Sequence, residues 1–596
     1  MSYGLFLAVI VAAVVALFLK GIYEERKKEA VFLERLAASY GKVPWGYEKK
    51  APSPGHKGSH KSFDRRNTDR YPDGYLQYLC RREDRFFLDE ITWKELDMEA
   101  VFARLDYTMS QAGREYLYAM LHRPAQNQKD AEKWEKAASY FASHSRERVK
   151  IQGILAKIGR GKGLSCYDCL EAVREAPKGK VLKEYAADMA YVAGVFLFML
   201  SLPSGLAFLA FVMVYQIVTY FGERAKILAC LLGVAGLLRM IKGAEVLYRS
   251  LPDEIRQQTE QELGFQGMDC FRKLRSLRRH SFWVLQCGRE GSSPVSVFAD
   301  YIRMLLHPDV IQFQLLRNKI LSLEPELWNA FAFTGYMDGS ISIAMYRGSL
   351  DYYSIPALYC AKDDDRRKKS PCPDTDFYGE ECFHPLLEIP VANSIRMKAG
   401  HGILLTGSNA SGKSTFLKTI AVNLLFAQTI DTVLARTFQA PFCRIFTAMQ
   451  DDGGSIQRGE SSYMAEILSL KRILDAGKEM QAPVFCFIDE ILRGTNTVER
   501  ISASTQILRS IRQPEMYCFA ATHDRELTEL LGELYDNYHF TEEVQGKDIS
   551  FSYRLQRGSA DTSNAIRLLD VMGYDREIVE QAIRQAENFL REGVWK

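Results

Sequence analysis

The sequence GSNASGKS at residues 407–414 constrains the fold more than any other feature of the chain. It directly follows an apolar run at residues 403–405 and opens a segment with helical spacing. Glycines let backbone N–H groups turn toward an anion, and the N-terminus of the following helix adds a favourable dipole. The pattern G-x-x-x-x-G-K-[S/T] between a strand and a helix therefore predicts a phosphate-binding loop. We assign to this loop Gly407, Asn409, Gly412, Lys413, Ser414 and Thr415.

Two carboxylates follow a second apolar run, residues 484–488, which has the composition of a buried parallel strand. In open α/β sheets, ligands bind beyond the carboxyl ends of the strands. We therefore expect Asp489 to hold Mg²⁺ together with the Ser414 hydroxyl, while Lys413 reaches the β- and γ-phosphates of ATP. Glu490 is then placed to act as general base toward the attacking water. These residues predict ATP hydrolysis.

The sequence around these motifs indicates an α/β fold for the C-terminal part of the chain. Helical runs such as residues 414–426 alternate with short β-rich runs, at 402–405, 430–434, 484–488 and 518–521. This alternation predicts a sheet covered by helices. The last run leads to His523, which we expect at the same edge of the sheet, where it could sense the γ-phosphate or orient the attacking water. We assign residues 371–596 to this domain.

Helical spacing dominates the chain before this domain. It extends over residues 86–176 and again over residues 228–329, and a further apolar stretch at 227–241 has the composition of a packed core helix. We expect an α-helical core, or lever, in two parts at residues 86–184 and 222–370. A charged segment at residues 363–373 marks its end.

Residues 185–221 interrupt the helical core with an apolar segment. The segment contains one charge, Asp188, and is broken near Pro203 by the sequence PSG. Two helices joined by a tight turn leave no unpaired backbone in lipid, and cationic residues flank both ends. The pattern predicts a transmembrane hairpin with both flanks in the cytoplasm. Because each half is short for a full span, a buried helical hairpin in a soluble core remains the alternative.

A second apolar segment lies at the start of the chain. Residues 4–19 carry no charge, and the cations Lys20 and Arg26 follow them closely. These flanks predict an uncleaved membrane anchor at residues 1–22 with its N-terminus outside, with a buried or interfacial helix as the alternative. Residues 23–85 are expected to form a cytoplasmic linker. We therefore expect a multi-pass protein of the cell (inner) membrane with its soluble domains in the cytoplasm.

Charge and cysteine content add little to these expectations. The net charge of +3 neither requires nor excludes a nucleic-acid partner. Residues 271–280 (FRKLRSLRRH) place five cations among leucines, which fits either a helix that follows phosphates or a solvated helix face. Of the twelve cysteines, only Cys166 and Cys169 form a C-x-x-C pair, so we expect reduced, packed thiols.

Several of these segments resemble the MutS family in order and spacing. The nucleotide motifs are TGSNASGKST at residues 406–415, FIDEILRGTN at 487–496 and ATHDRELTELL at 521–531. Between them, RGESSYMAE at 458–466 resembles the signature loop of the family, which implies that Ser461 reaches the ATP of a partner subunit. The sequence HPLL that begins at His384 resembles the lead-in beside the adenine, and residues 552–558 resemble the closing segment.

The resemblance implies an ABC-type P-loop ATPase domain in a homodimer that holds two MgATP molecules between opposing loops. No F-x-E motif precedes the helical core, so we expect the mismatch-reading N-terminal domain to be missing. No sequence follows the ATPase domain, so we also expect no appended nuclease domain. We interpret the chain as a membrane-anchored MutS-like ATPase that couples hydrolysis to binding of mismatched, damaged or branched DNA. The alternative is a membrane mechano-ATPase or scaffold that acts on a protein partner.

Overall fold

The computed structural model describes residues 20–592 with gaps. The residues outside the description are 1–19, 21–22, 25, 45–71, 161–164, 178–180, 201–202, 280, 286–293, 361–374, 408–410, 450–461, 480–481, 514, 546–547, 560–565, 567–568, 570–572 and 593–596. Nearly all of the predicted membrane anchor, residues 45–71 of the predicted linker and the charged segment at 363–373 therefore lie outside the described residues.

The described chain forms two compact units that are not consecutive stretches of sequence. Unit 1 comprises residues 1–83, 106–119 and 136–349, and unit 2 comprises residues 84–105, 120–135 and 350–596. The chain therefore passes between the units five times. The sequence predicts residues 84–105 and 120–135 in the linker and the helical core, whereas both segments pack within unit 2, the α/β unit.

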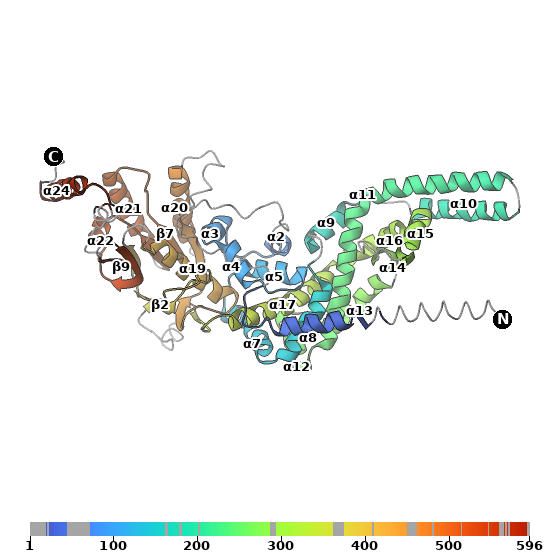
Figure 1. Cartoon of the computed structure of the whole chain (residues 1–596), viewed down its shortest axis with the longest axis horizontal. Coiled ribbons are helices and arrows are strands. Elements are labelled where there is room, and N and C mark those ends of the chain that lie inside the picture. Colours follow the sequence, from blue (N-terminus) through green and yellow to red (C-terminus); the bar gives the residue numbers. More distant parts are fainter. Residues whose placement is uncertain are drawn as a thin grey trace. The chain divides into compact units, whose positions relative to one another are not determined.

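Unit 1 is helical wherever the structure describes its regular elements (Figure 1). Its helices are α2 (Gly74–Cys80), α5 (Gln111–Leu121), α7 (Glu135–Ser143), α8 (Ser145–Ile158), α9 (Cys166–Glu175), α10 (Val181–Met199), α11 (Pro203–Ser250), α12 (Asp253–Leu263), α13 (Gly267–Arg278), α14 (Phe282–Leu285), α15 (Pro294–Leu306), α16 (Pro308–Ser322) and α17 (Glu324–Gly348). The helical core expected from the sequence is confirmed.

Helices α10 and α11 form the expected hairpin, and α11 begins at the predicted break, Pro203. Figure 1 shows the paired helices projecting from the rest of unit 1. Many apolar side chains of the hairpin are exposed, among them Phe196 (62%) and Phe211 (70%). By length and composition, residues 204–250 of α11 could cross a membrane, and Tyr185–Met199 is a shorter apolar helix.

The apolar stretch at 227–241 is packed, as expected, but it is not a separate helix. It continues α11 without a break, and Leu231, Val234 and Leu238 are buried in unit 1. One helix thus has an exposed apolar half followed by a buried half. The change occurs near Arg224 and Lys226, where polar side chains interrupt the apolar pattern.

A buried carboxylate of α17 fixes the start of α5 within unit 1. Asp338 accepts hydrogen bonds from the backbone N–H of Met109 and from both the N–H and the hydroxyl of Ser110, the last at 2.6 Å. These donors would otherwise be unsatisfied at the helix N-terminus. A side chain at Gly113 would come within 2.2 Å of the Asp338 carboxylate, which explains why only glycine fits there.

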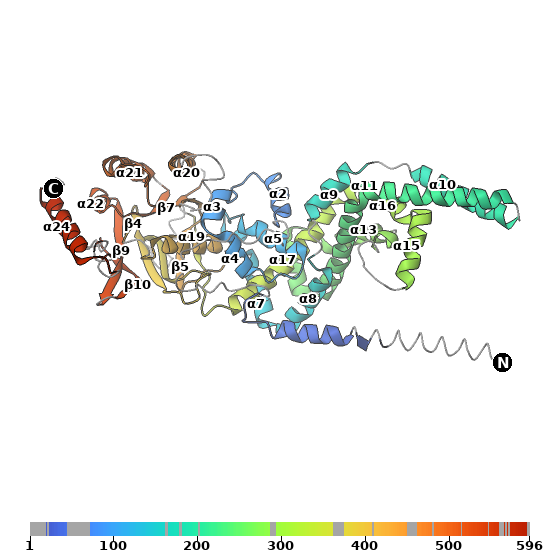
Figure 2. The same cartoon turned by 45° about the horizontal axis from the view of Figure 1, so that its top comes forward.

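Unit 2 contains two sheets and the helices that pack on them (Figure 2). The four-stranded sheet has the order β1-β5-β2-β3, with strands Ala357–Tyr359, Thr437–Pro441, Thr375–Cys382 and Asn393–Lys398. The six-stranded sheet has the order β10-β9-β4-β8-β7-β6, with strands Asp548–Arg557, Tyr535–Gln545, Gly402–Thr406, Met516–Ala521, Val484–Asp489 and Arg444–Ala448. Strands β9, β4, β8, β7 and β6 are parallel to their neighbours, and only β10 pairs antiparallel.

The helices of unit 2 come from both ends of the chain. They are α3 (Glu90–Glu95), α4 (Met98–Leu105), α6 (Gln128–Ala131), the 3₁₀ helix η2 (Glu132–Trp134), α19 (Lys413–Thr429), α20 (Ser462–Lys478), α21 (Thr497–Ile511), α22 (Glu526–Leu530) and α24 (Arg576–Glu592). The N-terminal segment is held to the α/β part by polar contacts, for example between Glu95 and the backbone N–H of Met449 at 3.0 Å.

One expected strand is wrong. Residues 430–434 form a turn after the end of α19, with a single isolated β-bridge between Val433 and Ser354, and the strand that follows is β5, at Thr437–Pro441. Side-chain hydrogen bonds stabilise the turn, because the Asn423 amide oxygen accepts from the N–H of Leu434 and the Thr432 hydroxyl donates to the Ile430 carbonyl. Asp431 has a positive φ of 50°, which a strand would not permit.

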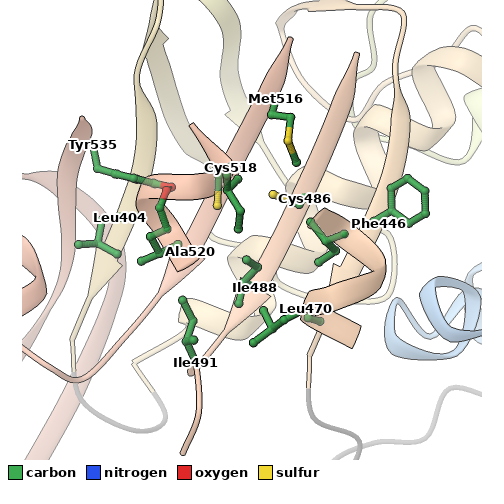
Figure 3. Close-up of a cluster of buried hydrophobic side chains, with 14 of the residues drawn as sticks. Leu404, Phe446, Leu470, Cys486, Ile488, Ile491, Met516, Cys518, Ala520 and Tyr535 are labelled. Carbon is green, nitrogen blue, oxygen red and sulfur yellow. The ribbon is translucent and has the colours of Figure 1, made fainter. Parts of the chain in front are cut away.

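The parallel strands β4, β6, β7 and β8 are buried on both faces, as strands of parallel sheets usually are. Figure 3 shows one face, where Ile488 of β7 and Ala520 of β8 pack with Leu470 of α20. On the other face Phe485 and Phe519 contact Phe377 of β2. The strand order brings the carboxyl ends of β4, β8 and β7 together at one edge of the sheet.

Candidate functional site

The described ends of the loop after β4 have the backbone conformation that the sequence predicted. Strand β4 ends at Thr406 and α19 begins at Lys413, so a strand, a loop and a helix follow one another as expected. Gly407 and Gly412 have φ values of 143° and 106°, a region that favours glycine. A side chain at Gly407 would also lie 2.9 Å from the Ser411 hydroxyl oxygen. Asn409 lies outside the described residues.

Lys413 is buried at the start of α19, where the free N–H groups of the first helical turn favour an anion. Its ammonium group donates a hydrogen bond to the carbonyl of Gly407 at 2.8 Å. Ser414 and Thr415 follow in the first helical turn and are exposed. The loop therefore presents one ammonium group and two hydroxyl groups close to the N-terminus of a long helix.

Asp489 is the last residue of β7 and lies beside this helical turn. Its carboxylate is hydrogen-bonded to the Ser414 side chain, and burial raises its pKa above the usual value while this bond opposes the rise. One carboxylate oxygen is buried and has no hydrogen-bond partner among the described residues. Magnesium prefers hard oxygen ligands of this kind. Asp489 and Ser414 therefore fit a Mg²⁺ site.

Glu490 and His523 lie in direct contact. The Glu490 carboxylate pairs with the imidazole Nε2 of His523 and, at 3.0 Å, with the guanidinium of Arg493. The hydrogen bond from His523 is the main reason why the pKa of Glu490 is lowered. Glu490 is therefore held as a carboxylate at the end of β7. Its backbone has a positive φ of 56°.

The carbonyl of Gly407 links Lys413 of the phosphate loop to the Glu490–His523 pair. It accepts the hydrogen bond from Lys413, and the Nδ1 atom of His523 lies 3.1 Å from the same oxygen. Both ring nitrogens of His523 thus face oxygen acceptors, one on Gly407 and one on Glu490. The structure therefore brings together the predicted residues Gly407, Lys413, Glu490 and His523.

An ion pair that sequence reasoning missed supports His523. Arg500 of α21 makes two hydrogen bonds to the carboxylate of Asp524, at 2.8 and 2.6 Å. The N–H of Asp524 also donates to the hydroxyl of Thr522. These contacts fix the turn that carries His523. No spacing rule could have linked Arg500 to Asp524, because they come from different elements.

His384, which was expected beside the adenine, lies between β2 and β3. His384 is buried, its Nδ1 accepts from the N–H of Leu386, and its Nε2 has no partner among the described residues. Burial, with a smaller contribution from Lys418, lowers the pKa of His384 to about 4. His384 is therefore a neutral, buried imidazole.

Tyr553 is a second site residue that sequence reasoning missed. Its ring lies against Gly412, since a side chain there would approach the ring within 3.2 Å, and it is 44% exposed. The side-chain amide of Asn393 donates a hydrogen bond to the Tyr553 carbonyl at 2.9 Å and accepts one from the N–H of Leu555 at 2.8 Å. These two bonds hold this part of β10 in place. An exposed ring beside a phosphate loop offers a surface on which a base can stack.

The segment that resembles the signature loop is described only from its end. Residues 458–461, including Ser461, lie outside the described residues, and α20 begins at Ser462. The carboxylate of Glu466, in the second turn of α20, accepts a hydrogen bond from the N–H of Leu492. A direct contact therefore joins α20 to the loop that follows Glu490.

The fold and the site together define a P-loop domain of the ATPase type. Residues 403–590 match the family described as MutS domain V. The DNA mismatch repair protein MutS of Fusobacterium nucleatum is 31% identical over 295 residues, which are 46% of this chain and 32% of the relative. The corresponding proteins of Persephonella marina and Thermus thermophilus are 28% and 30% identical over 211 and 205 residues.

Residues 403–590 therefore resemble domain V of the MutS family, and the resemblance noted in the sequence is confirmed for this part of the chain. The matched part of the chain spans 24% to 32% of the length of these relatives. Unit 1 makes up most of the remaining chain and is helical.

Proposed function

We propose that unit 2 binds ATP with Mg²⁺ and hydrolyses it. The observation that carries this proposal is the shared carbonyl of Gly407, on which Lys413 and His523 converge while His523 also holds Glu490. One loop thus links a phosphate-binding ammonium group to a carboxylate that can act as a base.

Each residue of the site has a distinct part in this reaction. Lys413 exchanges the Gly407 carbonyl for phosphate oxygens, and the N-terminus of α19 favours their negative charge. Ser414 and Asp489 hold Mg²⁺, which neutralises phosphate charge when it is bound. Glu490, kept ionised by His523, orients the attacking water and accepts its proton. Tyr553 offers a surface on which the base can stack.

The substitution Glu490→Gln tests the assignment of the base. It keeps the size of the side chain but removes its basicity, so we expect ATP affinity to be retained while turnover falls by about 10²-fold or more. Steady-state phosphate release and binding of a fluorescent ATP analogue measure the two quantities. Glu529→Gln, an exposed change on α22, is the matched control and should leave both unchanged. Full turnover in the Glu490→Gln variant would refute the assignment.

We further propose that the ATPase works as a homodimer and that its ATP state is coupled to DNA. Support for DNA comes from the relatives, which are named DNA mismatch repair proteins. Mismatched, damaged or branched duplex is the substrate class that we favour. Binding of linear, mismatched and branched DNA by the full chain, measured at several salt concentrations, tests this proposal, because contacts to phosphates weaken steeply as salt is raised.

The hairpin supports a second part of the proposal, a membrane location. A soluble protein rarely exposes a large continuous apolar surface, yet α10 and the first half of α11 expose many large apolar side chains, including Met189, Phe196, Phe211 and Val218. We propose that this hairpin inserts into the cell membrane and that both units lie in the cytoplasm. If DNA binding is absent, a membrane mechano-ATPase acting on a protein partner becomes the better proposal.

A further inference from the structure

A basic cavity lies in unit 1, between helices α11, α13 and α14. Its volume is about 610 Å³, within the range of pockets that hold small-molecule ligands. Five cationic side chains line the cavity, and the other lining side chains are one carboxylate and two aliphatic groups. The lining residues are Lys242, Glu245, Val246, Arg249, Arg275, Arg278, Arg279 and Leu285.

Glu245 organises three of these cations. Its carboxylate is largely buried and accepts hydrogen bonds from Arg249 at 2.8 Å, Arg275 at 2.7 Å and Arg278 at 2.6 Å. One negative charge is thus shared among three guanidinium groups, which fixes their positions but leaves an excess of positive charge. Guanidinium groups held in this way are prepared to bind phosphate oxygens in pairs.

Two further cations at the cavity have no counter-ion within the described part of the chain. Among the residues that the structure describes, neither Lys242 nor Arg279 forms an ion pair or a side-chain hydrogen bond. The lining therefore carries a formal excess of four positive charges, from five cations and Glu245. An excess of this kind in a concave site favours an anion with several charges.

The cationic run at residues 271–280 is therefore divided between two surfaces. Arg275, Arg278 and Arg279 face the cavity, whereas Arg272 and Lys273 do not line it and pair with Asp269, with a further contact from Lys273 to Glu326. The run is not one continuous track for a phosphate backbone. This division also supplies a matched control on the same helix.

We propose that the cavity binds a compact small molecule that carries two or more phosphates, such as a nucleotide. The charges converge on one hollow instead of following a line, and Val246 and Leu285 add apolar surface for a ring or base. A lipid headgroup fits less well. Lys242 lies about 30 Å farther along α11 than Phe221, the end of the proposed membrane hairpin, at a rise of about 1.5 Å per residue.

The binding site is tested on the full-length chain with the Lys413→Ala substitution, which removes phosphate binding by the P-loop. Calorimetric titration with inorganic triphosphate, and then with GTP, should show one saturable site per chain. The Lys242→Ala/Arg279→Ala double variant should bind roughly tenfold or more weakly, because two charge-assisted contacts are lost. The Arg272→Ala/Lys273→Ala double variant should bind as tightly as its parent.

Two further measurements test whether weaker triphosphate binding could instead come from misfolding or from the Lys413→Ala substitution. Val246→Glu adds an opposing charge at an exposed position and should also weaken binding, without removing any cation. In the unsubstituted chain, inorganic triphosphate should occupy a second site in addition to the P-loop, and the Lys242→Ala/Arg279→Ala substitutions should weaken that second site alone.

Three outcomes would overturn the proposal. One is the absence of triphosphate and GTP binding in both backgrounds. Another is equal weakening in the two double variants. The third is a chain that binds only a 30-base-pair duplex or vesicles with anionic lipid, and loses this binding only in the Lys242→Ala/Arg279→Ala variant. That result would assign the cavity to DNA or to the membrane.

Discussion

His523 controls the ionisation of Glu490, the proposed base, because the hydrogen bond between them is the main cause of the lowered pKa of Glu490. A base must be ionised to act, so activity is lost as the pH falls through its pKa. With His523→Ala the pKa of Glu490 rises, and we expect the acidic limb of the pH–rate profile to move to higher pH. Turnover should fall by at most about tenfold.

The control for this prediction is His401→Ala, at the opposite end of β4, where the imidazole lies near Asp536. This variant should leave the pH–rate profile unchanged. If the acidic limb stays in place in His523→Ala, the imidazole does not set the ionisation of Glu490, and the contact is only structural.

Most of the individual site residues could be predicted from the sequence, because Gly407, Lys413, Asp489 and Glu490 lie in short contiguous motifs. Tyr553 could not. Its place against Gly412 depends on a register shift between Phe551 and Leu555 in β10 and on a positive φ of 51°. Neither feature has a signature in a single sequence, since both arise from the pairing of β10 with β9.

At the scale of elements, a buried carboxyl in α5 makes the stability of unit 1 depend on pH. Glu115 is fully buried, and burial raises its pKa to about 8 from an ordinary 4.5. The unfolded chain therefore releases this proton at lower pH than the folded chain. Stability is highest below about pH 4.5 and is lost as the pH rises toward 8, at up to about 1.4 kcal/mol per pH unit.

The substitution Glu115→Gln should remove this dependence, because the amide cannot ionise. We expect the variant to be more stable than its parent at pH 8 and nearly equal to it at pH 5, in thermal unfolding followed by circular dichroism. Glu254→Gln, an exposed change on α12, should have little effect at either pH. A Glu115→Gln variant destabilised equally at both pH values would contradict the buried neutral carboxyl.

Helices and central strands were largely predictable because their patterns are local. Strands β4, β7 and β8 appear as apolar runs in the sequence, and the break before α11 coincides with Pro203. The four-stranded sheet was not predicted. Its strand β5 follows a turn held by Asn423 and Thr432, and its strand β2 pairs with β3 through two register irregularities. Such long-range pairings leave no periodic signal.

At the scale of the whole molecule, the proposed membrane location predicts which sites are accessible from outside the cell. Ser204 follows the break between α10 and α11, so a Ser204→Cys variant should react with a membrane-impermeant thiol reagent on intact cells. A Ser59→Cys variant should react only after lysis. The unsubstituted chain gives the background. Labelling in the opposite sense, or full extraction of the chain by carbonate, would exclude the proposed topology.

The proposed homodimer predicts that two inactive chains can complement each other. If Ser461 completes the site of the partner, mixing Lys413→Ala and Ser461→Ala chains gives heterodimers in which one site carries both lesions and the other carries neither. We expect partial ATPase activity to return on mixing. Heterodimers that form and remain inactive would show that the sites are completed within one chain or that both must be intact.

The interleaving of the two units has a consequence for how the protein is made. Glu95 bonds to Met449, which is 354 positions later in the chain, so the segment of α3 and α4 cannot reach its packed state until most of the protein has been synthesised. At about 5–20 residues per second this delay lasts roughly 20 to 70 s. During that time Phe86, Asp89 and Asp97 lack their final partners, which are Phe446, Arg472 and Lys418. The hairpin, in contrast, leaves the ribosome well before the ATPase domain, so insertion into a membrane would precede the folding of the nucleotide site.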